Sequence, residues 1–283
     1  SPINASPAGD RSGKLCQMGH SGLQSHYNPD RLTQPLMRKD GALVEATWDE
    51  AMAAIKQHVG PGAAGNRFAW FTGMVSGHQA ALLQAHLEAM GTDHHYIHEV
   101  VSNAVRQTVN RDALGEAMPV YKFDNAQVIL AFGADFLGPW QSPVHFTTQY
   151  VKFREAPRGI LVQVEPKMTV TGGNADLWVA IRPGTEGVLA LGIANVLLTK
   201  HNRDGNQLPG ELRGTIARYD LDTVTRITGV PNDRITKIAA WLNERSPSLG
   251  LRGRAAEGQE HGYDTAAASM SLNIILGNVR KTI

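Results

Sequence analysis

The sequence of 283 residues contains a single cysteine, Cys16, so it cannot form an internal disulfide. Without a C-x-x-C motif it also cannot form a local zinc knuckle or attach haem c. No apolar run reaches the roughly 18 residues that a transmembrane helix requires, and the first residues show no secretory signal pattern. The net charge of +1, with both signs mixed, predicts no binding to nucleic acid.

Several common catalytic signatures are also missing from the sequence. No G-x-G-x-x-G follows a predicted strand, and neither G-x-S-x-G nor H-E-x-x-H occurs. Residues 9–15, GDRSGKL, have three residues between the glycines where a phosphate loop needs four, and Leu15 follows Lys14. The histidines of HHYIH, residues 94–98, lack the further ligands of a zinc site, so we interpret them as ordinary surface or half-buried histidines on a strand.

What the sequence does contain is a regular alternation of strand-like and helix-like segments from about residue 43 onward. This pattern predicts an α/β fold with a doubly wound, mostly parallel sheet and flanking helices. The expected strands are 67–73, 94–100, 126–133, 159–166, 176–184 and 248–253, and the expected helices are 46–60, 76–91, 102–115, 142–155, 185–200, 230–246 and 263–277. Residues 201–223 are polar and glycine-rich, which favours a loop or connection.

Helix-start signals support this assignment. Thr47 and Glu50 have the spacing of a capping box. Ser76 is expected to cap the helix 76–91, and Ser142 to cap a helix with Pro143 in its first turn. The chain opens on a polar loop and ends directly after a helical pattern, so we expect it to be a segment of a longer polypeptide.

Three segments place glycine, proline or charged residues where an expected strand ends. Taken alone, each is a tight turn with caps. Together they should converge on one edge of the parallel sheet, where ligands bind in this class of fold. The third segment could hold an anion on the backbone N–H groups of a helix start. The residues concerned are Gly133 and Asp135; Glu165, Lys167 and Thr169; and Arg182, Gly184, Thr185 and Glu186.

The order of these motifs resembles the molybdopterin oxidoreductase family. The resemblance runs through LCQMGHSGLQSHYNPDRLTQPLMR, ATWDEAM, ILAFGADF, VQVEPKMTVTGGNADLWVAIRPGTEG and LNIILGN. Within the family, FGADFLGPWQSPVHFTTQYVKFR and the preceding MPVYKFDNAQ are most similar to the large iron–sulfur subunit of alternative complex III, a membrane quinol oxidase complex. The expected segments are a lead-in, 1–45, after an iron–sulfur region; a molybdopterin-oxidoreductase-like domain, 46–200; and its truncated continuation, 201–283.

The resemblance also implies a set of site residues. Cys16 matches the last cysteine ligand of a [4Fe-4S] cluster, whose other ligands would lie outside this chain because such a cluster usually needs four thiolates; the alternative is a lone buried cysteine. A molybdenum ligand would fall within residues 99–115, where there is no cysteine and Ser102 fits better as a helix cap. The positions expected to contact pterin dinucleotides, if these are bound, are Gly133, Asp135, Glu165 (where Asp is usual), Thr169, Arg182, Gly184 and Glu186.

Three functions remain open from the sequence. The preferred one is a subunit of a respiratory redox complex on the periplasmic face of a bacterial inner membrane. It would have iron–sulfur and cytochrome subunits as partners and a molybdopterin-type domain that serves as a scaffold without its own cofactor. The second is an active molybdenum or tungsten bis-pterin oxidoreductase acting on a small oxyanion or similar substrate, with the metal supplying the chemistry. The third is a nucleotide-dependent dehydrogenase, against which the missing glycine fingerprint argues.

Overall fold

The computed structural model describes residues 15–59, 68–100 and 102–283. They divide into two compact units, treated separately below: His20–Ser102, and Asn103–Ile283 together with residues 15–19. Most of the rejected phosphate-loop pattern, residues 9–14, lies outside the described residues. The segment boundaries expected near residues 45 and 200 stay a prediction.

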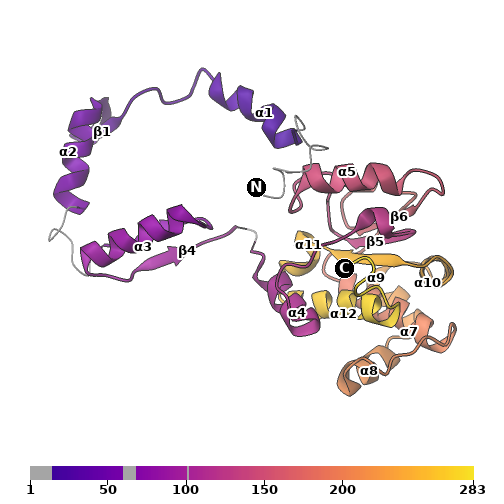
Figure 1. The fold of residues 1–283 in the computed structure, drawn as a ribbon. Helices are drawn as coiled ribbons and strands as arrows, with labels where there is room; N and C mark the ends of the chain where they lie inside the picture. Colours follow the sequence, from indigo (N-terminus) through magenta and orange to yellow (C-terminus); the bar gives the residue numbers. More distant parts are fainter. Residues whose placement is uncertain (1–14, 60–67, 101) are drawn as a thin grey trace. The chain divides into compact units, whose positions relative to one another are not determined.

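The first unit is built from short elements (Figure 1). In chain order, these and the helix that leads into the unit are α1 (Gln17–His26), β1 (Leu36–Lys39), β2 (Ala42–Glu45), α2 (Trp48–Val59), β3 (Trp70–Thr72), α3 (His78–Met90) and β4 (His95–Ile97). Strands β1 and β2 form an antiparallel hairpin that turns at Asp40 and Gly41, both with positive φ, whereas β3 and β4 are parallel. The predicted capping box is confirmed, because Glu50 N donates to Thr47 Oγ1 at 3.2 Å and Thr47 N donates to Glu50 Oε2 at 2.8 Å.

Two predicted helix caps are wrong by one residue. The N-cap of α3 is Gly77 rather than Ser76, with φ of 59°. The N-cap of α4 (Ala104–Leu114) is Asn103 rather than Ser102. Neither observed N-cap makes a side-chain capping hydrogen bond, and glycine, serine and asparagine are all favoured caps, so the sequence signal alone does not separate adjacent candidates.

The second unit contains a four-stranded sheet in the order β7-β6-β5-β8. Its strands are β5 (Val128–Phe132), β6 (Ile160–Glu165), β7 (Leu177–Ala180) and β8 (Ser248–Arg252). All three neighbouring pairs are parallel. The chain builds outward from β5 to β7 and then returns to place β8 on the other side of β5. The predicted doubly wound α/β fold is confirmed.

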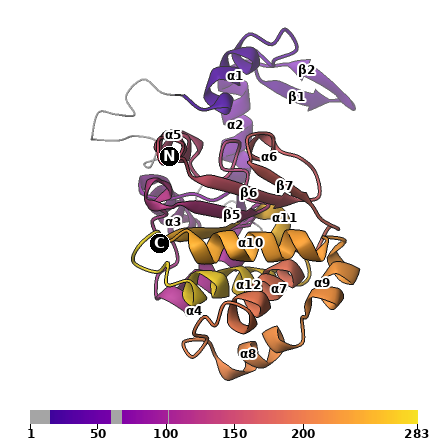
Figure 2. The ribbon, with the colours of Figure 1, turned by 90° about the vertical axis from the view of Figure 1, so that its right-hand side faces the viewer.

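Helices cover both faces of this sheet. Figure 2 shows α5 on one side and α7, α10 and α12 on the other. The elements around the strands are α4, the 3₁₀ turn η2 (Phe123–Asn125), α5 (Pro143–Phe153), α6 (Val170–Gly173), α7 (Glu186–Thr199), α8 (Gly210–Ala217), α9 (Leu221–Thr228), α10 (Asn232–Glu244), α11 (Arg254–Glu257) and α12 (Gly262–Ile275). Pro143 occupies the first turn of α5, as expected.

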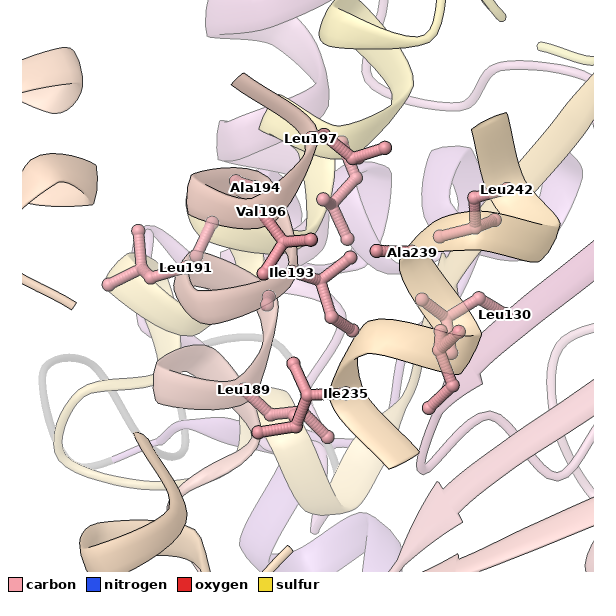
Figure 3. Close-up of a cluster of buried hydrophobic side chains, with 14 of the residues drawn as sticks. Leu130, Leu189, Leu191, Ile193, Ala194, Val196, Leu197, Ile235, Ala239 and Leu242 are labelled. Carbon is pink, nitrogen blue, oxygen red and sulfur yellow. The ribbon is translucent and has the colours of Figure 1, made fainter. Parts of the chain in front are cut away.

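The core forms because β5 is buried on both faces, as is typical of parallel sheets between helices. Ile129 belongs to the cluster on the α5 side, and Leu130 to the cluster on the opposite side. Figure 3 shows Leu130 beside Ala239 and Leu242 of α10, with Ile193 of α7 nearby. Because successive side chains of β5 point to opposite faces, helices on both faces pack against this one strand. This packing fixes the position of the carboxyl end of β5.

The loop predicted for residues 201–223 is wrong, because this region contains α8 and the start of α9. Asp220 caps α9 by accepting a hydrogen bond from Thr223 N at 2.8 Å. Ile216 and Val224 are buried in the same core as α7. Both helices are short and mostly polar, so tertiary burial of a few apolar side chains stabilises them rather than intrinsic helix propensity.

Candidate functional site

The strand-end residues singled out in the sequence do converge on one edge of the sheet. Phe132 pairs with Val164 and Glu165 pairs with Ala180, so the turns after β5, β6 and β7 begin side by side. Gly133 has φ of 62°, a conformation that favours glycine. In open parallel sheets this edge is where ligands bind.

Asp135, in the turn after β5, is engaged by the turn after β6. Its Oδ1 accepts hydrogen bonds from Thr171 N at 3.0 Å and from Thr171 Oγ1 at 2.7 Å. Thr171 Oγ1 in turn accepts from Leu137 N at 3.0 Å. A side chain at Gly138 would overlap the Asp135 carboxylate. Asp135 therefore joins two loops of the protein.

Glu165, the last residue of β6, accepts hydrogen bonds from its own strand and from the loop that follows it. Its Oε1 accepts from Thr169 N at 2.7 Å, and its Oε2 accepts from Gln163 Nε2 at 2.8 Å. The Thr169 hydroxyl donates to the Glu165 carboxylate and accepts from Gly172 N at 3.2 Å, which caps α6. The predicted site residues Glu165 and Thr169 are thus in contact, and their hydrogen bonds stabilise the turn after β6.

Arg182, after β7, binds the end of a helix. Its Nη1 donates to the carbonyl oxygens of Arg226 and Ile227, at 2.5 and 3.1 Å. These carbonyls lie in the last turn of α9, where a cation is stabilised by the helix dipole. The guanidinium hydrogen bonds that would otherwise recognise a phosphate are used in part for this contact.

Glu186, the first residue of α7, is 1% exposed. Burial raises the pKa of its carboxyl group, although hydrogen bonds from the backbone and from Gln259 act in the opposite direction. Its Oε2 has no hydrogen-bond partner among the described residues. Gly184 has φ of 81°, and a Cβ there would lie 2.6 Å from Gln259 Oε1. Of the predicted positions, Glu186 is the one with a buried side-chain oxygen that has no hydrogen-bond partner among the described residues.

A further group of charged residues at this edge was not predicted from the sequence. Arg252, the last residue of β8, lies beside Glu257 of α11 and Arg106 of α4. The strand SLGLRG ends in a charge followed by glycine, as the three predicted segments do, and that signal could have indicated Arg252. No sequence pattern around Arg106 indicates that it belongs to this group.

Cys16 is a partly buried free thiol immediately before α1. Within residues 15–59, 68–100 and 102–283, no group of three or more His, Cys, Asp and Glu side chains is arranged to hold a metal ion. The role of Cys16 as a cluster ligand stays a prediction. In the same ranges, no helix is both long and apolar enough to cross a membrane.

Comparison with known families identifies the fold. The molybdopterin oxidoreductase family model matches residues 31–283. The chain belongs to this family. The predicted resemblance is therefore confirmed at the level of the family.

Two curated relatives illustrate the range of the family. The chain is 27% identical over 275 residues to the menaquinone reductase molybdopterin-binding-like subunit of Nitratidesulfovibrio vulgaris, covering 95% of this chain and 39% of the relative. It is 25% identical over 280 residues to the assimilatory nitrate reductase catalytic subunit of Bacillus subtilis, covering 93% and 38%. The chain thus spans about two fifths of the length of these relatives.

A solved structure supports the fold independently. Acetylene hydratase from Pelobacter acetylenicus superposes with a TM-score of 0.65 at 20% identity, covering 93% of this chain and 38% of that one. At this identity the likeness concerns the fold alone.

The family name implies a pterin dinucleotide, whose phosphates require hydrogen-bond donors or cations. Among the positions predicted from the sequence, the carboxylates fit such a group poorly, and part of the donor set of Arg182 is already used. Asp135 accepts hydrogen bonds from Thr171 in the neighbouring turn, Glu165 accepts from Thr169 in its own turn, and Arg182 donates to α9. The free Oε2 of Glu186 is an acceptor, which cannot bind a phosphate. We therefore derive no chemical step through a pterin at this edge.

Proposed function

We propose that this chain belongs to the large molybdopterin-like subunit of a membrane-associated respiratory complex related to alternative complex III. Such a complex oxidises quinol and passes the electrons through iron–sulfur and cytochrome subunits. Cys16 would complete a [4Fe-4S] cluster with ligands outside this chain, at the periplasmic face of a bacterial inner membrane. The domain itself would be a scaffold and docking surface without its own cofactor.

The observation that carries the proposal is the internal use of the strand-end side chains. Asp135 accepts hydrogen bonds from the neighbouring loop, Glu165 accepts from its own loop, and Arg182 donates to a helix end. A loop network that satisfies itself needs no ligand to be stable. The similarity to a menaquinone reductase subunit whose name calls it molybdopterin-binding-like supports a role in quinone-linked electron transfer.

One observation favours a second candidate, an active molybdenum or tungsten bis-pterin oxidoreductase. The buried Oε2 of Glu186 has no partner among the described residues, and it could accept hydrogen bonds from the N–H groups of a guanine base. The relatives include a nitrate reductase catalytic subunit, which supports an oxyanion as substrate class in that case.

The test is metal and nucleotide analysis of the full-length protein, purified gently from its native host. Molybdenum, tungsten, iron and released guanine nucleotide are counted per chain. The proposal expects iron without molybdenum, tungsten or nucleotide. One molybdenum or tungsten with two guanine nucleotides per chain would overturn it in favour of the bis-pterin enzyme and lead to a substrate screen.

A further inference from the structure

The sheet has one topological switch point, between β5 and β8. The order β7-β6-β5-β8 places the later strands on opposite sides of β5, and Phe132 of β5 pairs with Arg252 of β8. In doubly wound sheets the crevice outside the carboxyl ends at this point is the usual ligand site.

The backbone closes tightly at this point. Gly253 N donates to Phe132 O at 2.9 Å. A Cβ atom at Gly253 would lie 2.5 Å from both Ala134 Cα and Gly133 O, which is closer than any side chain can approach. The turns that follow β5 and β8 are therefore in direct contact.

Buried charged side chains lie directly beside this contact. Arg106 Nε lies 3.2 Å from Glu257 Oε2, and Arg252 Nε lies 3.4 Å from Glu257 Oε1. Arg252 Nη2 also donates to Asn110 Oδ1 of α4. The three charged side chains are 1–3% exposed. Two arginines thus share one carboxylate, and they connect α4 to α11 and to the end of β8.

The same group reaches the other face of the sheet. The Arg106 guanidinium lies over the Trp140 ring, 5.4 Å from its centroid. Trp140 packs against Tyr121 and Phe146, which belong to the cluster on the α5 side. Arg106 therefore connects α4 to the aromatic side chains of the cluster on the α5 side.

We propose that the Arg106–Glu257–Arg252 cluster closes the switch-point crevice with the protein's own side chains and so excludes a nucleotide from it. This inference rests on the proposed function, because it explains how a domain of this family can hold its fold without a cofactor. Glu257 is the central member, since among the described residues it is the carboxylate that pairs with both buried cations. Removing Glu257 would leave two buried cations without a counter-charge, which is strongly destabilising.

The test is amide hydrogen exchange of the full-length protein, with and without millimolar guanosine diphosphate (GDP) as the probe. We expect the nucleotide to leave the exchange of α4 and α11 in the wild type unchanged. Glu257→Gln should accelerate α4 exchange roughly tenfold or more, because the segment is no longer held at the crevice. Glu260→Gln is the matched control: it removes an exposed carboxylate three positions away and should leave α4 unchanged.

If Glu257→Gln does not accumulate as folded protein, the same hydrogen-exchange measurement is made on Arg252→Met. It removes the hydrogen bond to Asn110 and should also accelerate α4 exchange. Wild-type α4 or α11 amides that GDP protects would overturn the inference, as would exchange of α4 that neither substitution alters. These outcomes are distinct from failure of the proposed function, which would appear as molybdenum, tungsten and nucleotide in the native protein.

Discussion

Glu257 Oε2 lies 3.2 Å from Arg106 Nε, although the two residues are 151 positions apart in the chain. The pair joins α4, which enters the domain first, to the short helix that follows the last strand. Both side chains are almost completely buried, so water does not screen the contact. The pair should therefore contribute most visibly to the free energy of unfolding when Glu257 is removed and the buried arginine is left without a counter-charge.

Glu257→Ala should lower the free energy of unfolding by about 3–5 kcal/mol, because it leaves two buried arginines without a counter-charge. Urea denaturation of the protein, followed by circular dichroism, measures this loss. Glu260→Ala, which truncates an exposed glutamate nearby, should change the free energy of unfolding by less than about 0.5 kcal/mol. Equal effects of the two substitutions would show that the cluster contributes nothing through charge.

Asp135→Asn should lower the free energy of unfolding by about 1–3 kcal/mol, because Thr171 then loses a charged acceptor. The exposed Asp124→Asn is the control. A double-mutant cycle with Thr171→Val isolates the pairwise term, since residues in contact are coupled. Additive effects of Asp135→Asn and Thr171→Val would contradict the interpretation that Asp135 acts through Thr171.

Much of the parallel sheet could be predicted because its signals are local. The apolar segments at β5 and β6 are buried along most of their length, so composition and flanking glycines were enough to locate them. The Thr47–Glu50 capping box was predicted because both partners lie within one turn. The convergence of Gly133 and Glu165 followed from parallel pairing, which brings the carboxyl ends of neighbouring strands together.

The partners of the site residues could not be predicted, because they come from distant parts of the chain. Asp135 accepts from Thr171, 36 positions away, and Arg106 pairs with Glu257. A charged residue after a strand has the same sequence signature whether it faces a ligand or its own protein. The helices α8 and α9 were missed for a related reason, since a few long-range apolar contacts stabilise them.

Asp176 should make the stability of the protein sensitive to acid. Partial burial raises the pKa of its carboxyl group, but hydrogen bonds from Arg154 and Leu161 N outweigh this and bring the pKa below its usual value. A depressed folded-state pKa contributes stability that is present above the unfolded pKa of about 3.9 and is lost as the pH falls through the folded value.

The measurement is the thermal midpoint of wild type and Asp176→Asn between about pH 7 and pH 3. We expect the wild type to be more stable at neutral pH, with the difference shrinking below about pH 4. Arg154→Gln, which removes the principal partner, should reduce the same acid dependence. A difference between wild type and Asp176→Asn that is constant with pH would contradict this assignment.

Glu186 should have the opposite pH dependence. Burial raises the pKa of its carboxyl group, so its favourable contribution is complete below the unfolded pKa of about 4.3 and is lost as the pH rises through the folded value. Glu186→Gln keeps the shape without the charge, and we expect it to unfold at a higher temperature than wild type at about pH 8, with the advantage vanishing near pH 4. Glu155→Gln, at an exposed position, should show no such trend. If Glu186→Gln is instead less stable at about pH 8 in the native protein, the ionised carboxylate must have a partner there. Hydrogen bonds from the backbone and Gln259 already act on this carboxylate, so such a result would favour the second candidate function only together with guanine nucleotide released from the native protein.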